Sequence, residues 1–247
     1  MSGPNTDRRP AGASAGRGDI ALHVRDLHRR FRAGGTEVRA VDGVSIEIPA
    51  GRLTVVKGRS GSGKTTLLNI LGLLDRPDAG ALSYGPVDVL KMSDPDRDRF
   101  RRHEIGFVYQ TIALVAAMSA AENVDFQMRV AGMKAAERAR RVNECLALVG
   151  LEKRMTHFPA EMSGGEQQRV AIARAIAHSP RVIYADEPTA ELDTMTGVHI
   201  VSIFKRLIEE EGITVVMTTH DPAMMELADN VVEMDGGRVV EHVDDSL

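Results

Sequence analysis

Short apolar runs and longer helical stretches alternate along most of the chain. Continuous apolar runs of the kind that form buried strands occur at residues 53–56, 105–110, 182–185 and 213–217. Between them lie stretches with helical spacing or helix-favouring composition, at residues 66–71, 93–103 and 198–208. Because helices usually join the strands of a parallel sheet, this alternation predicts an α/β fold with a parallel core sheet.

The two ends of the chain show different patterns. Residues 1–19 are rich in Gly, Ala, Arg, Ser and Pro with no apolar period, so we predict a disordered tail there and a folded domain over residues 20–247. Strand-like runs at 20–24 and 44–48 predict an antiparallel β subdomain ahead of the core sheet. A hairpin turn is predicted at residues 235–237, close to the C-terminus.

The middle of the chain has the composition of a helical subdomain. Residues 111 to about 163 are predicted to be helical throughout, and Val142, Cys145, Leu146 and Val149 recur at helical spacing. We place this subdomain at about residues 111–178. Cys145 lies on the apolar face of its predicted helix, which favours a small buried residue over a nucleophile.

Composition excludes several classes of protein. The 247 residues, 43% of them hydrophobic, suffice for one domain with a full core or a core with a smaller subdomain. The longest apolar-leaning stretch, residues 111–121, is far shorter than the ~20 residues that span a bilayer. We find no secretory signal, and a net charge of −4 argues against broad nucleic-acid affinity. We therefore expect a cytoplasmic protein.

Residues 58–65 fit the phosphate-binding pattern G-x-x-x-x-G-K-[ST]. A predicted strand precedes this loop and a predicted helix follows it, as the pattern requires, although a Gly/Ser-rich surface turn remains the plainer alternative. Backbone N–H groups at the start of a helix attract anions, Lys64 adds positive charge for the β- and γ-phosphates, and the Thr65 hydroxyl suits Mg²⁺. The predicted nucleotide contacts are Gly58, Arg59, Ser60, Gly61, Ser62, Gly63, Lys64, Thr65 and Thr66.

Polar residues follow three of the predicted strands. Asp186 and Glu187 come directly after the strand at 182–185, where Asp186 would hold Mg²⁺ and Glu187 would polarise a water for attack on the γ-phosphate. Gln110 and His220 also sit at strand ends, from which both can reach the γ-phosphate. In isolation, the carboxylates would be interpreted as a helix cap and the other two as solvated residues, so each assignment depends on the others.

A second glycine-rich helix start occurs at residues 162–169, ahead of an amphipathic helix at 170–176. A hydroxyl and free N–H groups at a helix N-terminus bind anions, although an ordinary Ser N-cap is the alternative. The anion-binding hypothesis covers Ser163, Gly164, Gly165 and Glu166.

Taken in order, these motifs resemble those of the nucleotide-binding subunits of ABC transporters, and the resemblance spans nearly all of residues 20–247. Residues 58–65 correspond to the Walker A loop, Gln110 to the Q-loop, 163–167 to the signature, 182–186 to Walker B, 190–193 to the D-loop, and His220 to the switch histidine. The resemblance implies a P-loop NTPase core with a helical subdomain carrying the signature.

The resemblance also implies roles for individual residues. ATP and Mg²⁺ are the expected cofactors, and two subunits are expected to pair head to tail so that Ser163 and Gly165 of one close on the γ-phosphate held by the other. Phe31 corresponds to an aromatic residue that stacks on adenine, and the alternative is an anchor in the core. The implied catalytic residues are Glu187, His220, Gln110 and Asp193, and the implied Mg²⁺ ligands are Thr65, Gln110 and Asp186.

Residues 68–77, 101–110 and the Glu of the signature resemble one branch of this superfamily. That branch contains lipoprotein-releasing, macrolide-exporting, antimicrobial-peptide-resistance and cell-division-associated ATPases. The chain departs from it at residues 111–117, where aromatic, polar, basic or Pro residues are more usual, and at Arg59, which replaces a common Pro. The apolar segment 111–118 is expected to border a groove that receives a permease helix, unless Ile112, Leu114 and Val115 pack inside the subdomain.

The sequence thus predicts an ATP-hydrolysing motor subunit of an ABC transporter. Its expected partners are a second ATPase subunit, identical or paired, and an integral membrane permease on a separate chain that holds it at the cytoplasmic face of the membrane. A regulatory module that signals through a membrane partner without moving cargo is an alternative. An ABC-type ATPase acting on DNA or ribosomes would need a coiled-coil insertion or tandem cassettes, and the sequence contains neither.

Overall fold

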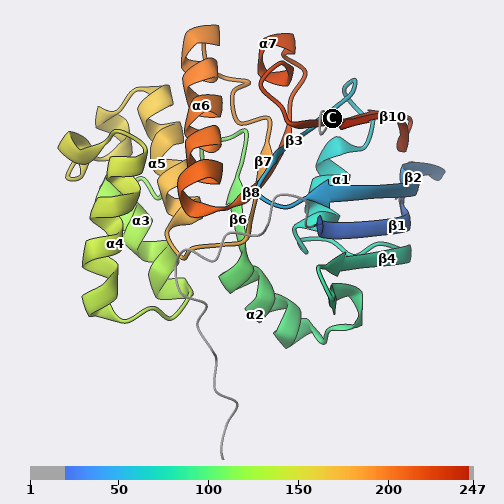
Figure 1. The fold of residues 1–247 in the computed structure, drawn as a ribbon, viewed down its shortest axis with the longest axis horizontal. Helices are drawn as coiled ribbons and strands as arrows, with labels where there is room; N and C mark the ends of the chain where they lie inside the picture. The colour runs from blue at the N-terminus through green and yellow to red at the C-terminus, as the bar shows by residue number, and fades with distance from the viewer. Residues whose placement is uncertain (1–19, 245–247) are drawn as a thin grey trace, which may run out of the picture.

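Two sheets form the framework of the protein, with helices gathered on both sides of the larger one (Figure 1). The computed structural model describes residues 20–244, and the predicted tail at residues 1–19 lies outside them. The larger sheet has six strands in the order β10-β9-β3-β8-β7-β6, with parallel pairing everywhere except between β9 and β10. The smaller has four antiparallel strands in the order β2-β1-β4-β5. The predicted α/β class, parallel core sheet and antiparallel β subdomain are therefore confirmed.

The strands agree closely with the apolar runs of the sequence. Those of the larger sheet are β3 (Leu53–Lys57), β6 (Ile105–Val108), β7 (Val182–Asp186), β8 (Thr214–Thr218), β9 (Asn230–Asp235) and β10 (Arg238–Asp244). Those of the smaller sheet are β1 (Ile20–Ala33), β2 (Thr36–Pro49), β4 (Ala79–Tyr84) and β5 (Val87–Asp88). The helices are α1 (Lys64–Leu71), α2 (Asp94–Glu104), α3 (Ala120–Val130), α4 (Ala135–Leu148), α5 (Gly164–Ile176), α6 (Thr194–Glu211) and α7 (Pro222–Met225), with single 3₁₀ turns at Val89–Lys91, Glu152–Arg154 and Pro159–Glu161.

The larger sheet separates two hydrophobic clusters. Neighbouring residues of β3 face opposite sides, as the two-residue period of a strand requires. Val55 belongs to the cluster formed with α3, α4, α5 and α6, whereas Val56 belongs to the cluster formed with α1 and the antiparallel sheet. Helix α1 therefore lies between the two sheets, and α3, α4 and α5 form a separate group on the other side (Figure 1).

The prediction that residues 111–163 are helical throughout is wrong at both ends of that range. Residues 111–119 form no helix, because Ser119 caps α3 and the buried Asn123 side chain binds the backbone of this segment instead. Asn123 accepts a hydrogen bond from Val115 N at 2.8 Å and donates to Met118 O at 2.9 Å. Beyond α4, Gly150 has a positive φ of 69°, and short 3₁₀ turns lead to α5. Local side-chain hydrogen bonds here replace helical ones.

Four aromatic side chains connect four structural elements near the sheet edge that carries the predicted site. Tyr84 donates its hydroxyl proton to Leu71 O, at the end of α1, and therefore accepts the proton of Tyr184 from β7. The ring of Phe107 packs against Tyr184 at 5.8 Å and stacks on Tyr109 at 5.7 Å between centroids. These four residues, here called the aromatic array, join α1, β4, β6 and β7.

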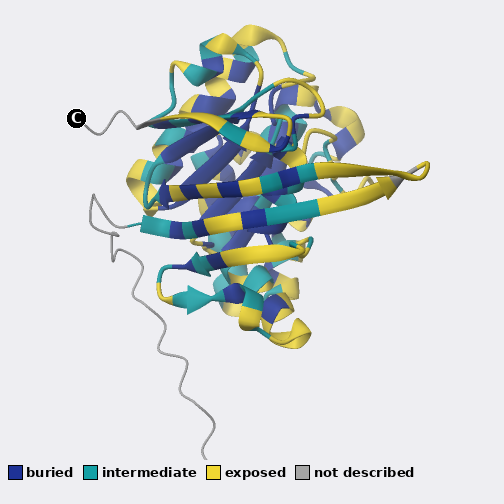
Figure 2. Cartoon of the chain, turned by 90° about the vertical axis from the view of Figure 1, so that its right-hand side faces the viewer, coloured by how far each residue is buried: buried dark blue, intermediate teal, exposed yellow. Residues whose placement is uncertain are grey.

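Burial differs sharply along the β1–β2 hairpin. Where the hairpin crosses the core its inward residues are buried, whereas its outer end is exposed (Figure 2). Phe31 and Val38 face each other across the ladder in this outer part and are 40% and 47% exposed. The hairpin therefore supplies both core residues and an open apolar surface.

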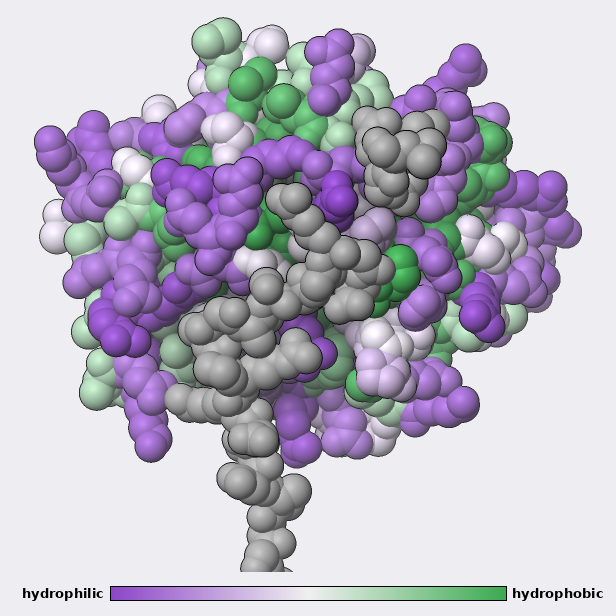
Figure 3. All heavy atoms as spheres, in the orientation of Figure 1, coloured by the Kyte–Doolittle hydropathy of each residue, from purple (hydrophilic) through white to green (hydrophobic). Residues whose placement is uncertain are grey.

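Among residues 20–244, no helix combines the length and the apolar character that a bilayer-spanning helix requires. The face shown in Figure 3 is hydrophilic over most of its area, with hydrophobic residues in separate groups. Cys145 is buried in the cluster around α4, as predicted, and burial raises the pKa of its thiol to about 12. Because this thiol stays neutral, Cys145 serves as a packing residue in the core.

Candidate functional site

The Walker A loop, residues 58–65, runs from β3 into α1 and is pressed against the backbone of two distant strands. Gly58 and Gly63 have positive φ values of 151° and 100°. A Cβ at Gly58 would lie 2.3 Å from Met234 O, and one at Gly63 would lie 2.0 Å from Ala40 O. These two positions therefore require glycine, for conformation and for space. The loop is further held by the hydrogen bond from Gly237 N to Ser62 O, at 3.0 Å.

Lys64 and Thr65 open α1 and direct a cation and a hydroxyl to the loop. The Lys64 side chain is 6% exposed, and its Nζ donates to Gly58 O at 2.8 Å and Arg59 O at 3.1 Å. Thr65 Oγ1 donates to Asp186 Oδ1 at 3.2 Å. The fold thus places the last residue of the Walker B strand beside the first turn of the Walker A helix, as the sequence predicted.

Asp186 and Glu187 are positioned by a buried threonine that sequence reasoning missed. Thr218, at the end of β8, donates to Asp186 Oδ1 at 2.7 Å and accepts from Glu187 N at 2.8 Å. Glu187 has a φ of 43°, a left-handed conformation that the Thr218 hydrogen bond supports. Its carboxylate lies 3.9 Å from Lys64 Nζ. The neighbouring strands β7 and β8 therefore hold two carboxylates in different orientations.

His220 and Gln110 lie at the same edge of the sheet. His220 Nδ1 lies 3.4 Å from Glu187 Oε2, and its side chain is 69% exposed. Gln110 is exposed just beyond β6, and the pairing of Val108 with Ala185 places it beside the end of β7. Both residues thus lie where the strand-end argument predicted, His220 in contact with Glu187 and Gln110 at the rim.

Phe31 lies at the outer end of the hairpin, near the Walker A loop. Its strand partner Val38 precedes Ala40 by two residues, and Ala40 O packs against Gly63. At a rise of about 3.3 Å per residue, Val38 is about 7 Å from that contact. The exposed Phe31 ring agrees with the stacking hypothesis better than with a core anchor, because a core side chain would be buried.

The predicted anion site at the start of α5 is separate from the Walker A loop. Ser163 caps the helix by accepting from Glu166 N at 3.3 Å, and Glu166 accepts from Ser163 N at 2.9 Å. Asp193 caps α6 by accepting from Thr196 N at 3.0 Å. The two caps line one open groove of about 290 Å³ with Ser163, Gly164, Gly165, Arg169, Glu191, Leu192, Asp193 and Thr196.

The fold therefore divides the predicted site residues between two places. Lys64, Thr65, Asp186, Glu187 and His220 form a connected set around the Walker A loop. The signature residues and Asp193 line the groove at the N-termini of α5 and α6. Figure 1 shows α5 and α1 on opposite sides of the larger sheet. Within residues 20–244 of one chain, no hydrogen bond or ion pair joins the two sets.

The connected set fits a Mg-nucleotide. Mg²⁺ is usually held by one or two carboxylates together with substrate phosphates and waters. Thr65 Oγ1 and Asp186 Oδ1 present such oxygens side by side, next to a loop with N–H groups and a lysine for phosphates. The described residues contain no cluster of three or more His, Cys, Asp or Glu able to form a metal cage by themselves. The donor set therefore suits a metal that arrives with its phosphates.

Comparisons with known proteins agree with this geometry. Residues 41–190 match the ABC transporter family. The lipoprotein-releasing system ATP-binding protein LolD of Nitrobacter winogradskyi is 42% identical over 220 residues, covering 89% of this chain and 95% of that protein. The macrolide export ATP-binding/permease protein MacB of Syntrophobacter fumaroxidans is 38% identical over 218 residues, which are 87% of this chain and 30% of MacB.

A solved structure with the same fold is a dimeric ATP-binding cassette in a post-hydrolysis state, bound to ADP and Pi. It superposes with a TM-score of 0.82 at 36% identity, over 90% of this chain and 98% of the other. Fold, motif order and sequence identity thus agree, and the branch to which the sequence pointed contains the relatives found. The chain belongs to the ABC transporter family and is an ATP-hydrolysing cassette with the P-loop fold.

Proposed function

We propose that this chain is the motor subunit of a transporter or mechanotransmission system of the branch that includes LolD and MacB. Two copies, or this chain and a paired cassette, close around two Mg-ATP and act on a separate membrane permease. The observation that carries this proposal is the division of the site, because the Walker A and signature residues each form a built half that a single chain leaves apart. A head-to-tail dimer completes both halves.

In the hydrolytic step, the residues around the Walker A loop bind and orient ATP and water. Lys64 and the loop N–H groups would hold the phosphates. Thr65, Asp186 and Gln110 would hold Mg²⁺, which when bound would neutralise phosphate charge. Glu187 orients the attacking water and accepts its proton. His220, at 3.4 Å from Glu187, holds that carboxylate toward the γ-phosphate.

The open groove at α5 supplies the second half of the site in trans. The N-terminus of α5 presents free N–H groups and the Ser163 hydroxyl to an anion, and the positive end of the helix dipole favours a phosphate there. Asp193 lies in the same groove and would position the partner's catalytic residues. A dimer thus contains two composite sites, each built from both subunits.

The segment 111–118 provides a surface for the permease. Ala113, Ala116 and Ala117 are exposed, as is Val115, whereas Ile112 and Leu114 are half-buried and Leu114 packs against the helical-side cluster. An apolar surface beside Gln110 suits an amphipathic helix, and it would link nucleotide occupancy to the position of the partner. Binding there would hold the cassette at the cytoplasmic face of the membrane.

Glu187→Gln tests the hydrolytic assignment. The variant keeps the size and hydrogen-bonding atoms of the side chain but cannot take the proton of water, so hydrolysis should fall about 10²–10⁴-fold. ATP would then persist between subunits, and size-exclusion chromatography with Mg-ATP should show a stable dimer for the variant and a monomer for the wild type. Full turnover in the variant would remove Glu187 from the catalytic role and make His220 the next residue to replace.

Glutamate substitutions at Ala113, Ala116 and Ala117 test the docking surface. A charge at an exposed alanine should disturb folding little but should block an apolar helix from binding. At least one of the three variants should keep its melting temperature and basal ATPase activity while losing co-purification with the permease. If all three either unfold the protein or leave the complex intact, the segment belongs to the core.

A further inference from the structure

Arg29 lies directly behind the ring of Phe31. Its Cζ is 4.7 Å from the ring centroid, which is within the range of a cation–π contact. Both residues belong to β1 and are two positions apart, so they share one face of the strand. The ring is 40% exposed, and one of its faces is covered by Arg29. The exposed part of the ring is therefore directed away from the guanidinium.

Two aspartates fix the guanidinium of Arg29 in this place. Arg29 Nε and Nη2 donate to the two oxygens of Asp75 at 2.8 and 2.9 Å, and Nη1 donates to Asp78 Oδ1 at 3.0 Å. A bidentate pair orients a planar guanidinium far better than a single contact does. The side chain of Arg30 differs, because within residues 20–244 it makes a single ion pair, with Glu37 at 3.8 Å.

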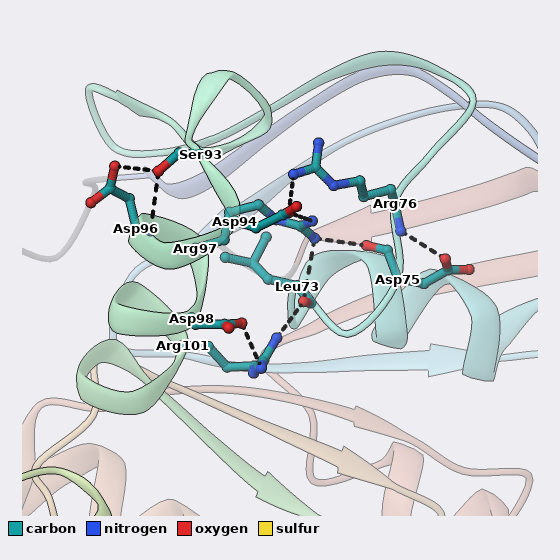
Figure 4. A network of polar contacts seen from close by, with 9 residues as sticks. All are labelled: Leu73, Asp75, Arg76, Ser93, Asp94, Asp96, Arg97, Asp98 and Arg101. Atoms are coloured by element: carbon teal, nitrogen blue, oxygen red, sulfur yellow. Dashed lines mark hydrogen bonds and ion pairs between the residues drawn. The ribbon is translucent and has the colours of Figure 1, made fainter.

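The turn that carries Asp75 is itself held by α2 (Figure 4). The buried Arg97 donates to Asp75 O at 3.1 Å, and both Arg97 and Arg101 donate to Leu73 O. Leu73 has a positive φ of 60°, which a leucine adopts only when its surroundings enforce it. Two arginines of α2 thus stabilise the strained turn at Leu73. Asp75, two residues further along this turn, holds Arg29.

The Phe31 ring and the Walker A loop share the β2 strand as a common support. Val38 pairs with Phe31, and Ala40 packs against Gly63. A small rotation of the Phe31 ring would therefore change its angle to a base whose phosphates are held in the loop. Packing in the core does not fix the ring angle, because the Phe31 side chain is 40% exposed.

We propose that Arg29 is a positioning residue for the nucleobase of ATP. Clamped by Asp75 and Asp78, its guanidinium backs one face of Phe31 and sets the ring angle, so that the opposite face receives the adenine. This inference rests on the proposed function, because it takes Phe31 as the stacking residue. Arg29 contributes to base binding alone, so its loss raises KM and leaves kcat unchanged.

Calorimetry with ADP and with inorganic pyrophosphate, both with Mg²⁺, separates base binding from phosphate binding without hydrolysis. Arg29→Ala should weaken ADP binding about three- to tenfold, the range of a partly exposed cation–π contact and its orienting effect. Arg30→Ala is the matched control, since it removes the same charge from the adjacent position, and it should change ADP affinity less than about twofold. Pyrophosphate affinity should be equal in the two variants, which also reports that Arg29→Ala has folded.

A double-mutant cycle with Phe31→Ala decides whether Arg29 acts through the ring. In the Phe31→Ala background, Arg29→Ala should cause no further loss of ADP affinity. An undiminished loss there, or equal losses for Arg29→Ala and Arg30→Ala in the wild-type background, would show a general charge effect and overturn the proposal. Asp75→Asn, which leaves both partners of the contact in place, should weaken ADP binding in the same direction, and wild-type affinity in that variant would contradict the clamp.

Failure of the inference and failure of the proposed function give different results. A wild-type protein that binds neither ADP nor pyrophosphate contradicts both. If the wild-type protein binds both probes and Phe31→Ala leaves ADP affinity unchanged, the ATPase assignment stands. Phe31 then does not stack on the base, and the proposed role of Arg29 is wrong.

Discussion

The two glycine-rich helix starts of this chain differ in how they are supported. The Walker A loop is enclosed by the backbone of β2 and β9, and its Lys64 is 6% exposed. The signature start is held by its own capping box between Ser163 and Glu166. A Cβ at Gly165 would lie 2.7 Å from the side chain of Thr196 in α6, whereas a Cβ at Gly164 would have only Leu192 nearby, at 3.7 Å. One loop is built to hold a ligand unaided, whereas the other is an open surface that a second subunit must complete.

Lys64→Ala should have the largest effect on binding. The substitution removes a charge-assisted phosphate contact of about 1.5–3 kcal/mol, which corresponds to a loss of about ten- to 150-fold in ATP affinity. Calorimetry on the dilute monomer measures this directly. An unchanged ATP affinity would contradict the difference proposed between the two helix starts, because the Walker A loop would then not be the primary nucleotide site.

The signature variants should spare ATP binding by the monomer and reduce turnover. Gly165→Asp places a carboxylate at a helix start that attracts phosphate, and Ser163→Ala removes a hydroxyl donor, so hydrolysis should fall about tenfold or more. A Cβ at Gly165 would also lie 2.7 Å from Thr196 Cγ2, so a melting curve must show that the Gly165→Asp variant is folded. Ser163→Ala also removes a helix cap, at a cost of about 1 kcal/mol, so a melting curve is the control. Loss of ATP affinity in the dilute monomer would show that this surface acts in cis, contrary to the proposed dimer.

The contribution of the Tyr84–Tyr184 pair to stability can be measured on the Walker A side of the protein, where Tyr84 binds the end of α1. Tyr84→Phe leaves Leu71 O and the Tyr184 hydroxyl without their partner inside the core, so we expect a loss of about 1–3 kcal/mol of unfolding free energy. Tyr184→Phe leaves the bond from Tyr84 to Leu71 O intact and should cost about 0.5–1.5 kcal/mol. Urea denaturation compares the two, and equal losses would contradict the assigned direction of the hydroxyl protons.

The sequence predicted the elements whose signal is local. Strands at 53–57 and 182–186 follow from continuous apolar runs, and the glycines of the Walker A loop follow from its pattern. The residue types also indicated correctly that Asp186 would lie near Thr65, because carboxyl ends of parallel strands share one edge.

What the sequence did not predict depends on contacts between distant residues. Thr218 directly follows the apolar run at 213–217, and nothing local marks its hydroxyl as the common partner of Asp186 and Glu187. The non-helical stretch at 111–119 depends on Asn123, whose side chain reaches back to the backbone. Asp75 and Arg29 are 46 positions apart, so their pairing follows from the fold alone.

The aromatic array gives the protein an internal optical reporter. The chain contains three tyrosines and no tryptophan, and Tyr84, Tyr109 and Tyr184 are all members of the array. Near-ultraviolet absorption and fluorescence of the unlabelled protein therefore originate almost entirely at the junction of α1, β4, β6 and β7. Burial raises the pKa of all three tyrosines, well above the usual value for the fully buried Tyr84 and Tyr184, and Tyr109 is 39% exposed. A shift of the segment beyond β6 can thus be followed spectroscopically through one exposed phenol, against two that stay protonated.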